Sequence, residues 1–138
     1  LNSKDKDQMS NQVQNPNSPS GEAGVKKPYD LEERTAVFGE EMIKFLRTLP
    51  ESNICRPLIN QAVRSGTSVG ANYMEADGAE SKKDFRHKIG ICKKEAKETM
   101  HWLRMLAVVN PDKKEQCRKL WQEAHELTLI FSSILKKK

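Results

Sequence analysis

The sequence predicts an all-α protein: an antiparallel, up-down-up-down four-helix bundle preceded by a disordered tail. From Tyr29 onward, apolar residues recur at spacings of three and four, which is the period of an amphipathic helix. The connections between the periodic segments are short, and short connections make successive helices antiparallel neighbours. Aromatic residues make up only 6% of the chain, which disfavours a strand-rich sandwich. At 138 residues, one structural domain is expected.

Residues 1–28 consist mainly of Asn, Ser, Gln, Pro, Gly and Lys. A segment with so few large apolar side chains cannot offset its ordering entropy by burial. We therefore predict a disordered tail over 1–28 and a bundle over 29–138. Met9 is a candidate native start, and whether the residues before it are native stays open.

The first helix is predicted to begin after Asp30, a favourable N-cap, and to end at Pro50. Acidic residues in its first turn, Glu32 and Glu33, complement the helix dipole. Its expected buried stripe consists of Leu31, Phe38, Met42, Phe45 and Leu49.

The second helix is predicted over about residues 56–76, with Pro57 in its first turn. Mid-helix glycines such as Gly66 and Gly70 each cost about 1 kcal/mol relative to alanine. We expect close approach of a neighbouring backbone to compensate for them. A phosphate-binding loop is the alternative, but no strand precedes these glycines and their spacing fits neither phosphate-loop pattern. The expected buried face is Ile59, Ala62, Gly66, Val69 and Tyr73.

After a turn at residues 77–79, the third helix is predicted to start at Ser81, with Asp84 three residues on as in a capping box, and to reach about Val109. The fourth helix should open with Asn110 as its cap and Pro111 in its first position. The core stripe of the third helix should be Phe85, Ile89, Cys92, Ala96, Thr99, Leu103 and Ala107. That of the fourth should be Cys117, Leu120, Trp121, Ala124, Leu127, Thr128, Phe131, Ile134 and Leu135.

The third helix also carries the positive charge of the chain. Residues 82–109 hold eight Lys and Arg against three Asp and Glu, an excess that equals the formal net charge of +5. Five of these cations fall within about 60° of one another beside the core stripe. We call them the basic ridge: Lys82, Arg86, Lys93, Lys97 and Arg104.

Two readings of the basic ridge stay open. It could bind the backbone of RNA or DNA. It could equally be a solvated face that pairs with acids of the first helix, namely Glu32, Glu33, Glu40 and Glu41. No aromatic residue interleaves the ridge, which argues against stacking on single-stranded bases.

A second apolar face of the third helix is predicted to lie opposite its core stripe. A helix that is apolar on two faces usually meets a second partner. We therefore predict a subunit interface, with scattered exposed apolar residues as the alternative. Its members are Ile91, Trp102, Met105 and Val109.

Patterns for metal, cofactor or catalytic chemistry are not found. His87, His101 and His125 are too dispersed for a ligand set, and no Glu-x-x-His pair exists. Ser65 and Ser68 have no base within one helical turn, so neither is a candidate nucleophile. We predict no enzyme activity and no cofactor. The polar residues of the second and third helices should instead form a buried network: Arg64, Asn72, Glu75, Glu95 and Glu98.

The cysteines and the hydropathy pattern bear on location. Cys55, Cys92 and Cys117 are odd in number and form no C-x-x-C, so we expect buried free thiols in a reducing compartment. No apolar run approaches the roughly 18 residues of a membrane span, and no secretory signal is recognisable. We therefore predict a cytoplasmic protein with no membrane association.

The stretches RSGTSVGANYMEADGAESKKDF (64–85) and KIGICKKEAKETMHWLRML (88–106) strongly resemble the four-helix-bundle proteins encoded in 23S rRNA intervening sequences. LEERTAVFGEEMIKFLRTLP (31–50) is similar to the first helix of that family, and the resemblance covers about residues 30–135. Met74 departs from it, because many relatives have a basic or polar residue there.

The resemblance implies a bacterial, cytoplasmic bundle that assembles into a ring-like homopentamer. It also implies a relation to accessory proteins of diversity-generating retroelements, which bind nucleic acid and a reverse transcriptase. It implies no enzymatic activity. We therefore predict a non-enzymatic homo-oligomer that binds structured RNA or DNA through the basic ridge. The alternative is a protein–protein interaction scaffold or accessory subunit with no direct nucleic-acid role.

Overall fold

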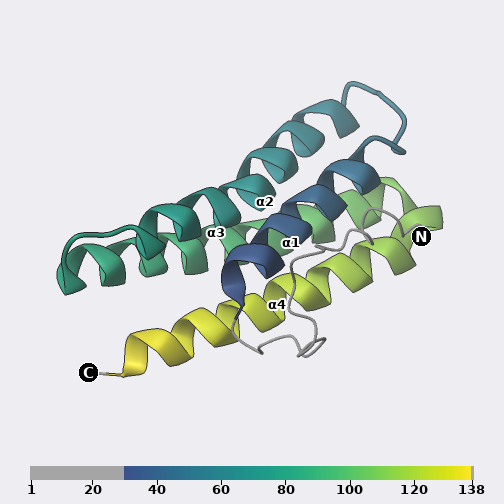
Figure 1. Ribbon diagram of the computed structural model, residues 1–138. Helices are drawn as coiled ribbons and strands as arrows, with labels where there is room; N and C mark the ends of the chain where they lie inside the picture. The colour runs from purple at the N-terminus through teal and green to yellow at the C-terminus, as the bar shows by residue number, and fades with distance from the viewer. Residues whose placement is uncertain (1–29, 138) are drawn as a thin grey trace, which may run out of the picture. The chain divides into compact units, whose positions relative to one another are not determined.

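The computed structural model describes residues 30–137, and the predicted tail over 1–28 lies outside them. Within the described residues the chain forms four α-helices: α1 (Leu31–Leu46), α2 (Cys55–Asp77), α3 (Lys82–Val109) and α4 (Lys114–Lys136). Successive helices run in opposite directions, as Figure 1 shows. The predicted antiparallel four-helix bundle is confirmed.

The connection between α1 and α2 differs from the predicted one. α1 ends at Leu46 rather than near Pro50. The chain then tightens, because the N–H of Thr48 donates to the carbonyl of Phe45 at 2.9 Å and the Thr48 hydroxyl donates to the same oxygen at 2.7 Å. α2 starts one residue earlier than predicted, and the hydroxyl of Ser52 accepts a hydrogen bond from the N–H of Cys55 at 3.0 Å.

The predicted cap of α3 is confirmed, and the predicted cap of α4 is wrong. Ser81 caps α3 and accepts from the N–H of Asp84 at 3.0 Å. Asn110 does not cap α4; its backbone N–H and side-chain amide donate to the carbonyl of Leu106 and so end α3. The reason is a short 3-10 helix, Pro111–Lys113, which delays the start of α4 to Lys114.

α3 occupies a central position in the bundle, because it packs along both α2 and α4. α1 packs mainly on α2 and to a small extent on α4, and its backbone does not come close to that of α3. The predicted stripes supply the core, although some of their members are only half-buried: Ile59, Tyr73, Phe85, Ala107, Leu120, Trp121, Ile134 and Leu135. The largest fully buried apolar side chains come from all four helices: Phe38, Met42, Val69, Ile89, Leu103, Leu106, Leu127 and Phe131.

The glycines of α2 lie against α1, as predicted. A Cβ atom at Gly66 would come within 3.0 Å of Met42 Cγ, and one at Gly70 within 3.2 Å of the carbonyl oxygen of Thr35. Both distances are shorter than ordinary van der Waals contact. The small residues of α2 therefore allow the backbones of α1 and α2 to approach closely.

We expect Gly70→Ala and Gly90→Ala to have opposite effects on stability. Gly90 lies within α3 with nothing within 4 Å of an added Cβ, so alanine there should raise the unfolding free energy by up to about 1 kcal/mol. At Gly70 the added methyl meets the backbone of α1, and this clash should cancel or reverse the same gain. Urea unfolding of both variants measures the difference. Equal stabilisation would contradict the close contact between α1 and α2.

Candidate nucleic-acid interface

Contacts with the neighbouring helices distinguish two sides of α3. On the α2 side, Lys88 Nζ lies 2.5 Å from Glu75 Oε1, and the Cys92 thiol lies 3.6 Å from the carbonyl oxygen of Val69. On the α4 side, Arg86 reaches the last turn of α4. The basic ridge contains Arg86 and therefore follows the α4 side of α3.

Arg86 has a structural role that the sequence analysis did not predict. Its guanidinium donates to the carbonyl oxygen of Leu135 at 2.7 Å and to that of Lys137 at 3.0 Å. The last carbonyls of a helix have no intrahelical partner and carry the negative end of the helix dipole. Arg86 thus joins the start of α3 to the end of α4, and part of its hydrogen-bonding capacity is taken up by these carbonyl oxygens.

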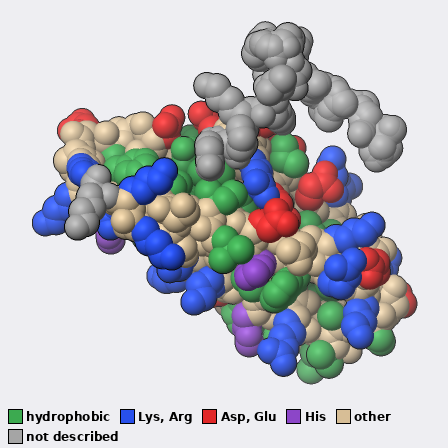
Figure 2. Space-filling model, turned by 90° about the horizontal axis from the view of Figure 1, so that it is seen from below, with side chains coloured by type: hydrophobic (Ala, Val, Ile, Leu, Met, Phe, Trp, Pro, Cys, Tyr) green, Lys and Arg blue, Asp and Glu red, His purple; other side chains and the backbone are tan. Residues whose placement is uncertain are grey.

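The other four ridge residues differ from Arg86. Lys82, Lys97 and Arg104 are exposed, and Lys93 is half-buried. Among residues 30–137, none of the four side chains has an ion pair or a hydrogen bond. Figure 2, which looks at the bundle from the side of α4, shows Lys and Arg side chains gathered on one face with histidine among them.

No ion pair joins the ridge to the acids of α1 in residues 30–137, and the backbones of α1 and α3 do not approach each other closely. Glu41 instead lies near Lys44 of its own helix, with 3.5 Å between Oε2 and Nζ. The cation of α1, Arg34, binds Glu123 and Glu126 of α4 at 2.7 and 3.0 Å. The pairing with α1 in the alternative reading is therefore wrong for residues 30–137, whereas the reading of the ridge as a solvated face stays open.

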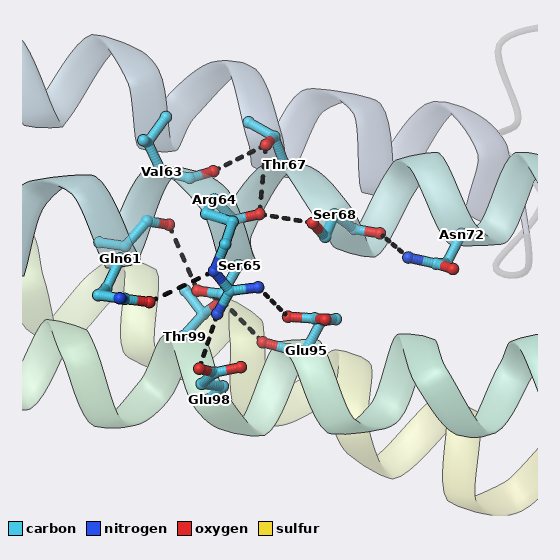
Figure 3. Close-up of polar contacts among 11 residues, drawn as sticks. Gln61, Val63, Arg64, Ser65, Thr67, Ser68, Asn72, Glu95, Glu98 and Thr99 are labelled. Carbon is cyan, nitrogen blue, oxygen red and sulfur yellow. Dashed lines mark hydrogen bonds and ion pairs between the residues drawn. The ribbon is translucent and has the colours of Figure 1, made fainter.

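A polar cluster joins α2 to α3, as predicted. Arg64 Nη2 lies 2.7 Å from Glu98 Oε2, and Arg64 Nη1 lies 3.2 Å from Glu95 Oε1, as Figure 3 shows. Beneath this pair, the fully buried Thr99 hydroxyl lies 2.7 Å from Ser65 Oγ. These contacts fix the rotation of α3 about its axis and so determine which way the basic ridge faces.

Two residues of the predicted network lie outside this cluster. The amide of Asn72 donates to the carbonyl of Ser68 in the same helix at 2.9 Å and does not link helices. Glu75 binds Lys88, about two turns nearer the start of α3 than Glu95. The predicted link between the helices is therefore confirmed for Arg64, Glu95 and Glu98, is separate for Glu75, and is wrong for Asn72. Its predicted burial holds for Glu95 but not for Arg64, whose side chain is 45% exposed.

The Arg64–Glu98 contact predicts a loss of stability in acid. The hydrogen bond from Arg64 holds the pKa of Glu98 below its ordinary value of 4.5. A carboxyl whose pKa is lowered by folding stabilises the folded state above the unfolded pKa, and this contribution is lost as the pH falls through the lowered pKa. In the Glu98→Gln variant, the free energy of unfolding should therefore fall less steeply with decreasing pH below about pH 4.5 than it does in the wild type.

A matched control for this titration is Glu115→Gln in α4. Arg118 also lowers the pKa of Glu115, but that pair is fully solvent-exposed and lies within one helix. Exposed ion pairs contribute little because water screens them. Chemical denaturation between pH 3 and 7 measures the pH dependence of the unfolding free energy, and Glu115→Gln should alter it less than Glu98→Gln. An equal effect would mean that the ion pair between α2 and α3 stabilises the bundle no more than an exposed pair does.

The second apolar face of α3 is placed differently from the prediction. Trp102 and Val109 do not lie opposite the core but pack in part against its edge, and all four residues of the face are half-buried. The reason is that Trp102 is three residues from Thr99 and four from Leu106, so it borders the buried stripe. Ile91 and Met105 are not part of the core cluster.

The indole N–H of Trp102 is buried and makes no hydrogen bond within the described chain. It lies near enough to Glu98 to contribute to the lowered pKa of that carboxyl, but its geometry is not that of a hydrogen bond. Buried tryptophan N–H groups usually have an acceptor. This one is buried within the bundle, and the carboxylate of Glu98 is the nearby acceptor toward which a small rotation could turn it.

The thiols of the bundle are buried, as predicted. Burial raises the pKa of Cys92 to about 12 and that of Cys117 to about 11. Both thiols therefore stay protonated at neutral pH. In residues 30–137 no group of three or more His, Cys, Asp and Glu side chains is arranged to hold a metal ion. No helix in the same range is long and apolar enough to cross a membrane.

An aromatic pair near the basic ridge was missed by the sequence analysis. The rings of Trp121 and His125 on α4 are stacked, with centroids 5.3 Å apart and an interplanar angle of 22°. The spacing of four residues was the only signal in the sequence. Because Trp121 also fits the core stripe of α4, this signal alone does not distinguish the pair from ordinary core.

Comparisons with known proteins agree with this architecture. A family model described as 23S rRNA-intervening sequence protein matches residues 29–133. A crystal structure from Bacteroides thetaiotaomicron, of a protein with unknown function from the S23 ribosomal protein family, is similar with a TM-score of 0.71 and 31% sequence identity. That similarity covers 78% of this chain and 99% of the other. Among curated proteins, no match was found. The helical architecture and the family match over most of the bundle together show that this chain belongs to the 23S rRNA-intervening sequence protein family.

Proposed function

We propose that this protein is a non-enzymatic homo-oligomer that binds structured RNA or DNA through the basic ridge of α3. The observation that carries the proposal is that Lys82, Lys93, Lys97 and Arg104 follow one side of α3 without an acidic partner among the described residues. Some cations elsewhere on the bundle, such as Arg34 and Arg64, are held by carboxylates, whereas others, such as Lys83, have no ion pair among the described residues either; what distinguishes the ridge is its alignment along one side of α3. A row of unpaired cations is the arrangement that phosphates can neutralise.

Assembly would increase the affinity of such a ridge. If several copies present their ridges around one axis, a folded RNA or a duplex meets more than one ridge at once, and the linked contacts multiply. The second apolar face, Ile91, Trp102, Met105 and Val109, is our candidate for the contact between copies. Support comes from Ile91 and Met105, which are half-buried and lie outside the core cluster, so that part of this apolar surface is not covered by the bundle itself. We propose a pentamer, on the family resemblance alone.

The expected selectivity is modest. Lysine and arginine side chains that contact phosphates position a nucleic acid but carry little sequence information. We also propose a bacterial cytoplasmic location, which the three unpaired thiols support because free cysteines are typical of reducing compartments. The second candidate function is a protein–protein interaction scaffold, favoured by the apolar face of α3 rather than by its charge.

The direct test is the double substitution Lys93→Glu with Lys97→Glu. We expect the wild-type protein to bind structured RNA and duplex DNA at low salt, with an affinity that falls steeply as salt rises. The double variant should bind much more weakly. The slope of log binding constant against log salt concentration should be smaller in magnitude by about 1.8 if both lysines contact phosphates, because each contact contributes about 0.9. Fluorescence anisotropy at four or more salt concentrations measures both quantities.

The matched control is Lys83→Glu with Lys94→Glu. These two lysines are exposed on the same helix, outside the basic ridge, and their replacement changes the net charge by the same amount. If the control variant loses as much affinity as the ridge variant, general charge rather than the ridge drives binding. If wild type does not bind at low salt, the scaffold function becomes the better proposal.

A further inference from the structure

The Trp121–His125 stack lies on the flank of α4 that faces α3. Arg34 of α1 binds Glu123 and Glu126, which marks the opposite flank of α4 as the α1 side. Trp121 lies roughly 140–160° around the helix axis from those two glutamates. Because α3 is the other neighbour of α4, the aromatic pair borders the groove between α3 and α4.

The register of α3 against α4 places the pair beside the basic ridge. At one end, Arg86 holds the carbonyls of Leu135 and Lys137. At the other end, the 3-10 turn after Asn110 connects the two helices directly. Lys97 lies eleven residues after Arg86 on α3, and His125 lies ten to twelve residues before Leu135 and Lys137 on α4. Because the two helices are antiparallel, Lys97 and His125 therefore lie at about the same level along the bundle.

Both rings keep part of their surface in solvent, as do the ridge residues. Trp121 and His125 are half-buried, whereas Lys97 and Arg104 are exposed. Since the two rings stack on each other, each keeps one outer face that the other ring does not cover. The face in Figure 2 shows histidine and apolar side chains next to a run of Lys and Arg.

We propose that the basic ridge and the Trp121–His125 stack together form a site for unpaired nucleotides, so that this face prefers single-stranded nucleic acid to an uninterrupted duplex. Lys93, Lys97 and Arg104 bind consecutive phosphates, and a base stacks on an outer face of the aromatic pair. This proposal rests on the nucleic-acid function proposed for the ridge and specifies its ligand.

The physical basis is that phosphates and bases need different partners. A row of cations attracts any phosphate backbone, paired or not. An aromatic ring adds affinity only for a base whose face is free, and in a duplex each face is already covered by its neighbours in the stack. A cationic row beside an aromatic pair therefore adds affinity for single strands without specifying sequence. This proposal departs from the expectation that stacking is disfavoured, because it takes the aromatic residues from α4 and not from the ridge itself.

The test compares an oligo-dT strand with a blunt DNA duplex of the same length, at one fixed low salt concentration. The variants are Trp121→Leu, which keeps apolar bulk against the core, Trp121→Phe, which keeps a ring, and His125→Ala. We expect the full-length wild type to bind the single strand more tightly. Trp121→Leu and His125→Ala should weaken single-strand binding at least about fivefold, with duplex binding unchanged, and Trp121→Phe should retain most of it.

Tryptophan fluorescence offers an independent readout. The chain has two tryptophans, so Trp102→Phe leaves Trp121 as the only emitter. Stacking of a base on Trp121 should quench this emission on addition of oligo-dT and leave it unchanged on addition of duplex.

The outcomes separate this proposal from the function on which it rests. If Trp121→Leu and His125→Ala bind both probes as wild type does, while the ridge variant loses both, the ridge function stands and the stacking site is overturned. If wild type binds neither probe, both proposals fail. If Trp121→Leu instead changes the sedimentation coefficient, the aromatic pair belongs to a contact between copies, and the stacking site is again overturned.

Discussion

Replacing Trp102 with glutamate is expected to dissociate the proposed oligomer into folded monomers. Large aromatic side chains at the centre of an interface often contribute 2 kcal/mol or more, which corresponds to about a 30-fold weaker contact at each interface. A buried carboxylate without a partner would add to the loss. Sedimentation velocity at micromolar concentration should show a smaller species, and far-ultraviolet circular dichroism should show that helicity is retained.

Two further variants keep this prediction testable. Trp102 packs partly against the core edge, so its replacement could also lower the stability of the monomer. Ile91→Glu avoids this difficulty because Ile91 is outside the core cluster, and it should dissociate the oligomer as well. Val108→Glu is the control, since Val108 is 74% exposed on another side of α3 and should leave assembly intact. A monomeric wild type would remove the interface assignment altogether.

Phe131→Ala is expected to cause the largest loss of stability. Phe131 of α4 is fully buried in the core, and truncating a buried phenylalanine costs about 3–5 kcal/mol through lost burial and the cavity that remains. For a domain of this size, that loss should lower the melting temperature by at least about 12 °C. Thermal unfolding followed by circular dichroism measures the shift.

The control for Phe131 lies two residues earlier in the same helix. Leu129 is 56% exposed, so Leu129→Ala should change the unfolding free energy by no more than about 0.5 kcal/mol. A comparable loss at both positions would show that Leu129 is covered in solution by something other than its own bundle. A small loss at Phe131 would contradict its place in the core.

Local signals in the sequence were sufficient for the helices and most of their caps. The spacing of three and four from Tyr29 onward is a property of each helix by itself, and so is a serine followed three residues later by Asp84. The same holds for the two glycines of α2, whose cost within a helix implied a close neighbour before any neighbour was known. Such local signals were not sufficient at Asn110. The preference of asparagine for helix ends did not show whether its side chain would bond to the end of α3 or to the start of α4.

The candidate site depended more on tertiary structure. The sequence alone grouped Lys82, Arg86, Lys93, Lys97 and Arg104 on one side of a helix, because helical periodicity determines which residues of one helix share a side. It contained no information on which neighbouring helix that side would border. Only the packing of α3 between α2 and α4 separated Arg86, which binds the end of α4, from the four cations without a partner in the described chain.

The amphipathic pattern of this chain by itself determined that it forms four antiparallel helices, since each helix must bury one apolar stripe and short connections leave few arrangements. Tertiary structure alone decided that the flank of α4 with the stacked Trp121 and His125 faces away from α1, from which we infer its place beside the basic ridge. The physical reason is that residues about 25 positions apart meet only through the register and rotation of two packed helices, and these are set by contacts such as Arg86 with Leu135 and Arg64 with Glu98.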